Sequence, residues 1–173
     1  REPGMAKGAQ SRGFLTRGFL TGESSAEEYA AQIDGAQYSG FNLLLSDGNT
    51  LVYCSNRDGN PRPLAPGIYG LSNHLLDSPW PKLVAARERF AKALHRLPDE
   101  SAFFDLLADQ AIVADENLPS TGVPIEWERL LSGIFVKSES YGTRASTLVW
   151  QAADGKITVH ENSFGSNGQP LQS

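Results

Sequence analysis

Apolar residues recur every three or four positions in several stretches of the chain, a spacing that predicts amphipathic helices. The first stretch begins at Ser11 and ends at Gly22. Serine–glutamate pairs three residues apart, the capping-box pattern, then predict a second short helix that stops at Gly35. Pro81 suits the first turn of a longer helix because its missing N–H needs no partner there. We expect this helix over residues 82–96, and shorter ones over residues 103–110 and 126–131.

In two other regions the helical spacing of apolar residues is replaced by short continuous apolar runs, which are typical of strands. Asp-Gly pairs at residues 47–48 and 154–155 each separate two such runs, and this dipeptide is a strong hairpin signal. The runs of the first pair are apolar on both sides, which indicates a strand covered on both faces. The predicted hairpin strands span residues 41–45 with 50–55, and 147–151 with 157–161; shorter strands are expected at 68–71 and 134–136.

The order of these elements predicts the fold class. Antiparallel hairpins and helices fall in separate blocks, which favours an α+β arrangement over a doubly wound parallel sheet. The length of 173 residues suits a single domain, residues 1–173. The N-terminal decapeptide reads as a loop and has no initiator Met, so we interpret the chain as processed or as part of a longer protein. The simpler alternative for this segment is a disordered leader.

Charge and composition narrow the classes of partner. The net charge of −5 and the absence of a Lys/Arg block argue against a general nucleic-acid surface. No apolar run is long enough to cross a membrane, so no transmembrane segment is expected. A single cysteine, Cys54, cannot form an internal disulfide, which favours a reducing compartment and hence a cytoplasmic location.

Most candidates for chemistry have a simpler structural interpretation. The three histidines are too far apart in sequence for usual zinc-ligand spacing, so no metal site is predicted. Cys54 lies in the middle of a predicted strand and is more consistent with a buried, inert thiol than with a nucleophile. Ser72, His74 and Asp77 together suggest a catalytic triad, but no nucleophile elbow accompanies them.

Asn73 and Arg144 remain as candidate site residues. Asn73 follows the predicted strand 68–71 and can both donate and accept hydrogen bonds. Arg144 precedes the predicted strand 147–151, next to small residues that let a guanidinium bind a carboxylate. Taken alone, each also fits a structural role, Asn73 as a turn cap and Arg144 as the partner of an acid.

Several segments, taken together and in order, resemble the NRDE family, the transport-and-Golgi-organisation family of bacteria and eukaryotes. The resemblance extends over nearly the whole chain, to about residue 164. Its most specific parts are the blocks around Asn73 and Arg144. The segments are "GFNLLLSDG", "YCSNRDG", "GIYGLSNHLLDSPWPK", "DENLPSTGV", "EWERLLSGIFV" and "YGTRASTLV".

The resemblance implies a fold and a set of site residues. The family is similar to N-terminal-nucleophile hydrolases, whose fold is a four-layer αββα sandwich of two antiparallel sheets. Those amidases use an N-terminal Cys as the nucleophile, and the α-amino group of the same residue is the general base. An Asn that follows a strand helps to hold the oxyanion, and an Arg late in the chain lies near the nucleophile. Asn73 and Arg144 resemble these two residues as catalytic groups, which implies that they converge on one cleft.

The chain departs from the family at its N-terminal end. In the family, the nucleophile-bearing first strand and the Asn-Arg-Asp-Glu signature come before the residue at which this sequence begins. The chain therefore looks like the C-terminal two-thirds of the family fold, without its first strands. We expect it to leave the apolar faces of strands 41–45 and 51–54 uncovered and to associate with an N-terminal segment of the same protein or with a second copy.

The resemblance leaves three functional classes open. The favoured one is binding or trafficking of a small hydrophobic or acyl metabolite of the haem or acyl-coenzyme A class, with His74 as the candidate haem ligand. The alternative is a Cys-nucleophile amidase acting on C–N bonds when the missing N-terminal segment is present. A scaffold role in membrane organisation is the third. The chain as printed begins with Arg1, so we expect it to have no hydrolase activity of its own.

Overall fold

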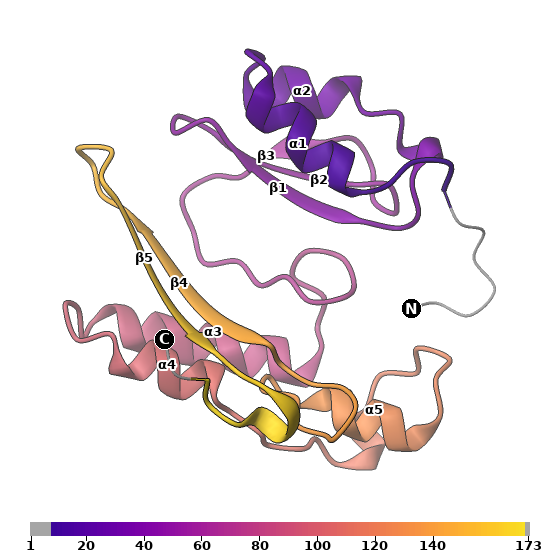
Figure 1. Ribbon diagram of the computed structural model, residues 1–173, viewed down its shortest axis with the longest axis vertical. Helices are drawn as coiled ribbons and strands as arrows, with labels where there is room; N and C mark the ends of the chain where they lie inside the picture. The colour runs from indigo at the N-terminus through magenta and orange to yellow at the C-terminus, as the bar shows by residue number, and fades with distance from the viewer. Residues whose placement is uncertain (1–7, 172–173) are drawn as a thin grey trace. The chain divides into compact units, whose positions relative to one another are not determined.

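A computed structural model describes residues 8–171 and divides the chain into two compact units, one through Ser78 and one from Pro79. The first unit contains two helices and a three-stranded sheet, and the second contains three helices and a hairpin (Figure 1). In chain order the elements are α1 Gly13–Thr21, α2 Ala26–Gln32, β1 Asn42–Ser46, β2 Leu51–Ser55, β3 Arg62–Pro63, α3 Pro81–Leu94, α4 Ser101–Leu107, α5 Ile125–Ser132, β4 Ala145–Gln151 and β5 Ile157–Ser163, with 3₁₀ turns at Gly35–Gln37, Asp115–Asn117 and Ser166–Gly168.

The second helix begins as its sequence signature predicts. The Ser25 hydroxyl accepts a hydrogen bond from the Glu28 backbone N–H at 3.3 Å, and the Glu28 carboxylate accepts one from the Ser25 N–H at 3.0 Å. This is a complete capping box. The first free N–H of the helix, that of Ala26, donates at 3.0 Å to the carboxylate of Asp47. The start of α2 is therefore tied to the β1–β2 turn.

The sheet of the first unit has the order β1-β2-β3, with both pairs antiparallel. Leu45 pairs with Val52 and Leu43 with Cys54, which is the register that the Asp47–Gly48 turn dictates. Helices α1 and α2 cover one face of this sheet (Figure 1). The core between them is made of Leu15, Ala26, Ala30, Phe41, Leu45, Val52 and Cys54.

A close approach between α1 and α2 depends on a glycine. A Cβ on Gly18 would lie 2.5 Å from the hydroxyl oxygen of Tyr29. That hydroxyl donates to the Leu15 carbonyl at 2.8 Å, and the Tyr29 ring packs against Phe19 with centroids 5.5 Å apart. The absence of a side chain at position 18 thus lets a tyrosine from α2 reach the backbone of α1.

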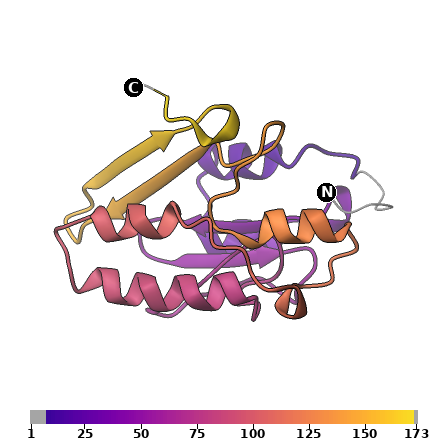
Figure 2. The same cartoon turned by 90° about the horizontal axis from the view of Figure 1, so that it is seen from below.

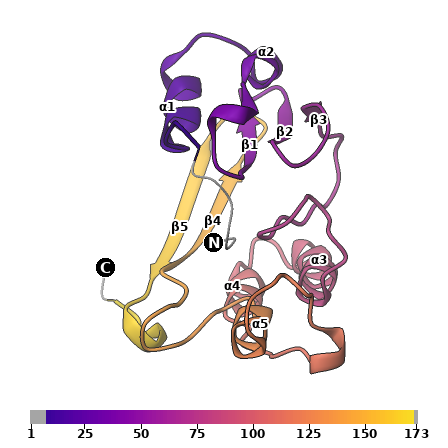
Figure 3. The same cartoon turned by 90° about the vertical axis from the view of Figure 1, so that its right-hand side faces the viewer.

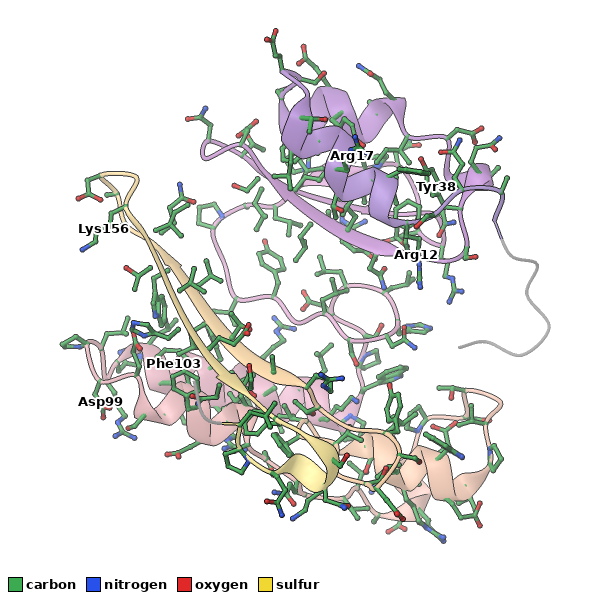
Figure 4. All side chains as sticks on the ribbon, in the orientation of Figure 1. Arg12, Arg17, Tyr38, Asp99, Phe103 and Lys156 are labelled. Carbon is green, nitrogen blue, oxygen red and sulfur yellow. The ribbon has the colours of Figure 1, made fainter. Side chains whose placement is uncertain are left out.

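In the second unit, α3 and α4 lie side by side and pack against the β4–β5 hairpin (Figures 2 and 3). Phe103 on α4 is 1% exposed and is the centre of this core (Figure 4). Its ring makes edge contacts with Phe90 of α3 and Trp150 of β4, at centroid distances of 5.1 and 5.0 Å. Aromatic edge contacts of this kind add to the burial energy of each ring.

The structure confirms an α+β protein with two small antiparallel sheets, and it corrects two predicted strands. Residues 68–71 and 134–136 are not strands. The edge beside β2 is taken instead by β3, where Pro63 is tolerated because an edge strand does not need every N–H. Residues 134–136 bond elsewhere: Phe135 N–H donates to the Asp109 carbonyl at 2.7 Å, and Val136 pairs with Thr143.

The expectation of uncovered apolar strands was wrong for one face of the sheet. Phe41, Leu45, Val52 and Cys54 are all buried beneath α1 and α2. The hydrophobic side chains that remain exposed on these strands are Leu44, at 45%, and Leu51, at 40%. The finer assignment to an αββα sandwich, like the single-domain expectation for residues 1–173, stays a prediction.

Candidate functional site

Residues 70–78, here called the site loop, form a closed loop rather than the end of a strand. The Asp77 N–H donates to the Gly70 carbonyl at 2.8 Å, and the Gly70 N–H donates to the Asp77 carboxylate at 2.7 Å. These two bonds join the ends of the loop and hold Asp77 at a φ of +57°, in the left-handed region that Asp and Asn enter more readily than other residues with a side chain. Asn73 and His74 lie between the joined ends, and both are exposed.

The site loop rests on the face of the sheet opposite the helices. Tyr53 of β2 is 1% exposed, and its hydroxyl donates to the Asn42 side-chain oxygen at 2.8 Å while accepting from the Leu76 N–H at 3.3 Å. The Asn42 side-chain nitrogen then donates to the His74 carbonyl at 2.8 Å. A polar network on the strands therefore fixes the backbone on both sides of the loop tip. The buried Tyr53 hydroxyl both donates and accepts in this network, and a buried polar group that is fully paired favours one conformation.

The side chain of His74 is also held in place. Its Nδ1 lies 2.6 Å from the Ser78 hydroxyl oxygen, and that hydroxyl donates to the Leu75 carbonyl at 2.7 Å. Ser78 is buried, with 7% of its surface exposed. The imidazole is thus oriented by a buried residue of the same loop, although the ring itself is on the surface.

Arg144 lies in the second unit, one residue before β4, and its side chain is exposed. The backbone around it is fixed: Thr143 exchanges hydrogen bonds with Val136 through both its N–H and its hydroxyl, and the Phe164 N–H donates to the Arg144 carbonyl at 2.8 Å. Gly142 is required here, because a Cβ would lie 2.8 Å from the Val136 carbonyl oxygen. Asn73 and Arg144 belong to different units, so their convergence stays a prediction.

Cys54 is a buried thiol, as the sequence predicted. It is 5% exposed, and burial raises its pKa above the ordinary range, which keeps it protonated and unreactive. A cavity of about 240 Å³ lies beside it. The side-chain amide of Asn56, which lines this cavity, is fully occupied by Phe41, Gly35 and Tyr38. Ligand pockets are usually about 300–1,000 Å³, so this cavity accommodates only a small group.

Lys82 has a structural role that the sequence reading missed. Its ammonium donates to the Leu131 carbonyl at 2.6 Å and lies 5.8 Å from the Trp80 ring centre. Burial lowers its pKa. Lys82 thus connects the start of α3 to the last turn of α5. The sequence did contain a signal for this role, namely a lysine in the first turn of a predicted helix. A positive charge there is unfavourable with respect to the helix dipole, which indicates that the side chain has a specific partner.

Residues 8–171 contain neither a metal-binding cluster nor a membrane-spanning helix. No group of three or more His, Cys, Asp or Glu side chains in this part of the chain is placed to hold a metal ion together. Within the same residues, no helix is both long and apolar enough to cross a membrane.

Comparison with known proteins gives a consistent result. Residues 1–166 match the family described as Transport and Golgi organisation 2. The Bos taurus Transport and Golgi organization protein 2 homolog is 35% identical over 182 residues, which cover 94% of this chain. The Homo sapiens homolog is 33% identical and the Mus musculus homolog 31%, each again over 94% of this chain. The chain spans about 65% of the length of these curated relatives.

Proposed function

Because the chain belongs to the Transport and Golgi organisation 2 family, we propose that its site loop binds a small hydrophobic metabolite that carries a carbonyl or carboxylate group. Haem and acyl-coenzyme A are the two ligand classes that the family resemblance implies. The exposed amide of Asn73 donates to a ligand oxygen, and the His74 imidazole contacts the ligand through its second ring nitrogen.

The observation that supports this proposal most directly is the preformed state of the site loop. Gly70 and Asp77 close its ends, and the Tyr53–Asn42 pair fixes its backbone from beneath. A loop that is already ordered loses little conformational entropy on binding, so more of the interaction energy appears as affinity. Polar side chains displayed on a rigidly held loop are typical of binding sites.

For haem, the donor set fits axial ligation by a single imidazole. His74 is exposed on the loop, and a partner on Nδ1 is the usual way in which proteins orient a metal-binding histidine. The cavity beside Cys54 is too small to enclose a porphyrin. We therefore place the ligand on the surface of the site loop, and its apolar part needs cover from another polypeptide, either an N-terminal segment of a longer chain or a second copy.

A second candidate is amide hydrolysis with a nucleophile supplied from outside this sequence. The fixed backbone around Asn73 favours it, because an oxyanion donor must be held in place before charge develops. Cys54 does not supply the nucleophile, since it is buried and its thiol is protonated. On this alternative, the chain as printed leaves simple N-acyl amides unchanged, and a longer protein hydrolyses them.

Haem titration followed by the Soret absorbance tests the favoured proposal. We expect His74→Ala to weaken haem binding at least tenfold, as loss of an axial ligand should. His95→Ala is the matched control, because His95 is also exposed but caps the C-terminal end of α3. In parallel, calorimetry with an acyl-coenzyme A should show a loss of affinity for Asn73→Ala. Equal effects of the His74 and His95 substitutions, together with no response to Asn73→Ala, would contradict the proposal.

A further inference from the structure

The hydrogen bonds of Ser78 determine where the proton of the His74 imidazole lies. A serine hydroxyl has one proton to donate and can accept further bonds. The Leu75 carbonyl oxygen can only accept, and it lies 2.7 Å from the Ser78 oxygen, so the serine proton is used there. The contact of 2.6 Å between the same oxygen and His74 Nδ1 therefore needs its proton from the imidazole.

The opposite tautomer is disfavoured by the same geometry. If Nδ1 carried a lone pair, it would face an oxygen whose proton points away, or Ser78 would have to turn from Leu75. Ser78 is 7% exposed, so water has little access to compensate for the lost bond. The Ser78 N–H also donates to Leu75, at 3.2 Å, and this bond holds the serine backbone in the position that the arrangement requires.

We infer that Ser78 is a positioning residue that fixes His74 as the Nδ1–H tautomer, so that Nε2 is the nitrogen that carries the electron pair. The ligand atom that such a nitrogen takes is an electron-pair acceptor, such as the iron of haem or an acidic proton. The assignment of that ligand rests on the proposed function, whereas the tautomer rests only on the geometry of Ser78, Leu75 and His74.

Nuclear magnetic resonance of the ¹⁵N-labelled chain tests the inference without any ligand. At about pH 9, where an ordinary imidazole is neutral, two-bond ¹H–¹⁵N correlations identify the protonated nitrogen of each histidine. For His74 we expect the protonated nitrogen to be Nδ1. Free histidine prefers the Nε2–H form, so protonation at Nε2 in the wild-type chain would overturn the inference.

Two substitutions separate the role of the hydroxyl from that of the fold. Ser78→Ala should move the His74 proton to Nε2, and Ser78→Thr, which keeps a hydroxyl, should retain Nδ1–H. The histidine at the end of α3, His95, is the internal reference and should not change. An unchanged Nδ1–H form in a folded Ser78→Ala variant would also overturn the inference. If Ser78→Ala does not fold, the wild-type spectrum still decides which nitrogen of His74 carries the proton, and loss of Nδ1–H in Ser78→Thr would overturn the role of the hydroxyl.

Haem titration of the same variants then distinguishes this inference from the proposed function. We expect Ser78→Ala to lower haem affinity about 10- to 100-fold, the usual effect of removing the partner that orients a metal-binding histidine, and Ser78→Thr to restore it. If the tautomer is as inferred and His74→Ala leaves haem binding unchanged, the proposed function fails and the role of Ser78 stands.

Discussion

The two hairpins of this protein have the same turn chemistry and differ in how far the rest of their unit supports them. Both turns contain Asp-Gly with the glycine in the left-handed region, at φ +88° for Gly48 and +83° for Gly155. The carboxylate of Asp47 accepts three backbone N–H bonds, one of them from α2. For Asp154, the hydrogen bond observed is local, from the Lys156 N–H at 3.0 Å.

The strands differ in the same way. The β1–β2 pair gains a third strand, two covering helices on one face and the site loop on the other. The β4–β5 pair packs Leu148 and Trp150 against α3 and α4, while the opposite face has Val149, Ile157 and Val159 exposed at 57–62%. A local turn signal therefore specifies a hairpin, but contacts from distant parts of the chain determine how firmly it is held.

The largest expected effect comes from removing the aromatic centre of the second unit. Phe103→Ala should destabilise that unit by roughly 3–5 kcal/mol, since a fully buried ring is lost and a cavity remains. All three tryptophans, Trp80, Trp127 and Trp150, lie in this unit, so tryptophan fluorescence during urea unfolding reports on it. Unchanged hydrogen exchange in β1 and β2 would show that the two hairpins depend on separate cores, and a parallel loss there would break the comparison.

Substitutions of the two turn aspartates, Asp47 and Asp154, test directly whether the first hairpin is held more firmly by the rest of its unit than the second. Asp47→Ala leaves the Ala26, Asn49 and Thr50 N–H groups without their acceptor, whereas Asp154→Ala removes one local bond. We expect Asp47→Ala to lower the thermal midpoint clearly and to speed hydrogen exchange at the start of α2. Asp154→Ala is the matched control and should have a much smaller effect. Equal losses of thermal stability in the two variants would mean that the hydrogen bond from Ala26 of α2 to Asp47 does not stabilise the first hairpin.

Acid should weaken the Asp47 turn. The bond from the Ala26 N–H, followed by those from Thr50 and Asn49, lowers the pKa of Asp47 to about 2. A carboxylate with a lowered pKa stabilises the folded state above its unfolded value of about 4, and this contribution is lost as the pH falls toward 2. Wild-type stability should therefore fall between about pH 4 and pH 2 more steeply than that of Asp47→Asn. Superimposable pH profiles would contradict this assignment.

The smallest effect is expected on the exposed face of the second hairpin. Val149→Thr keeps the β-branched shape and should change the free energy of unfolding by no more than about 0.5 kcal/mol. The matched change Val52→Thr, at a position 1% exposed in β2, buries a hydroxyl and should cost about 1–3 kcal/mol. A large effect at position 149 would indicate that this face is covered in solution.

The fold could be predicted where the signals are local. The Asp-Gly turns, the Ser25–Glu28 box and Pro81 at the first turn of α3 each involve residues within a few positions of one another. The strand predicted at 68–71 fails because the backbone N–H and carbonyl of Gly70 both bond to Asp77 instead of to a neighbouring strand. Short apolar runs do not reveal which distant partner will take their N–H groups.

The residues of the candidate site come from the sequence motif and stay a prediction, whereas the side chains that support the loop are seen only in the structure. Asn73 and His74 were recognisable from the motif, and they are displayed together on the site loop. Tyr53 and Asn42, which hold that loop, looked like ordinary strand residues, because a hydrogen bond across 23 positions to Leu76 leaves no periodic signal. Arg144 lies in the second unit, so its contribution to the site stays a prediction.

The contact between Gly18 and Tyr29 has an evolutionary consequence. A Cβ at position 18 would require the tyrosine hydroxyl to shift from its place beside the Leu15 carbonyl, so we expect the residues at the two positions to be correlated. An alignment of the family should show Gly at position 18 wherever position 29 is Tyr. Larger residues at position 18 should occur together with residues smaller than Tyr at position 29.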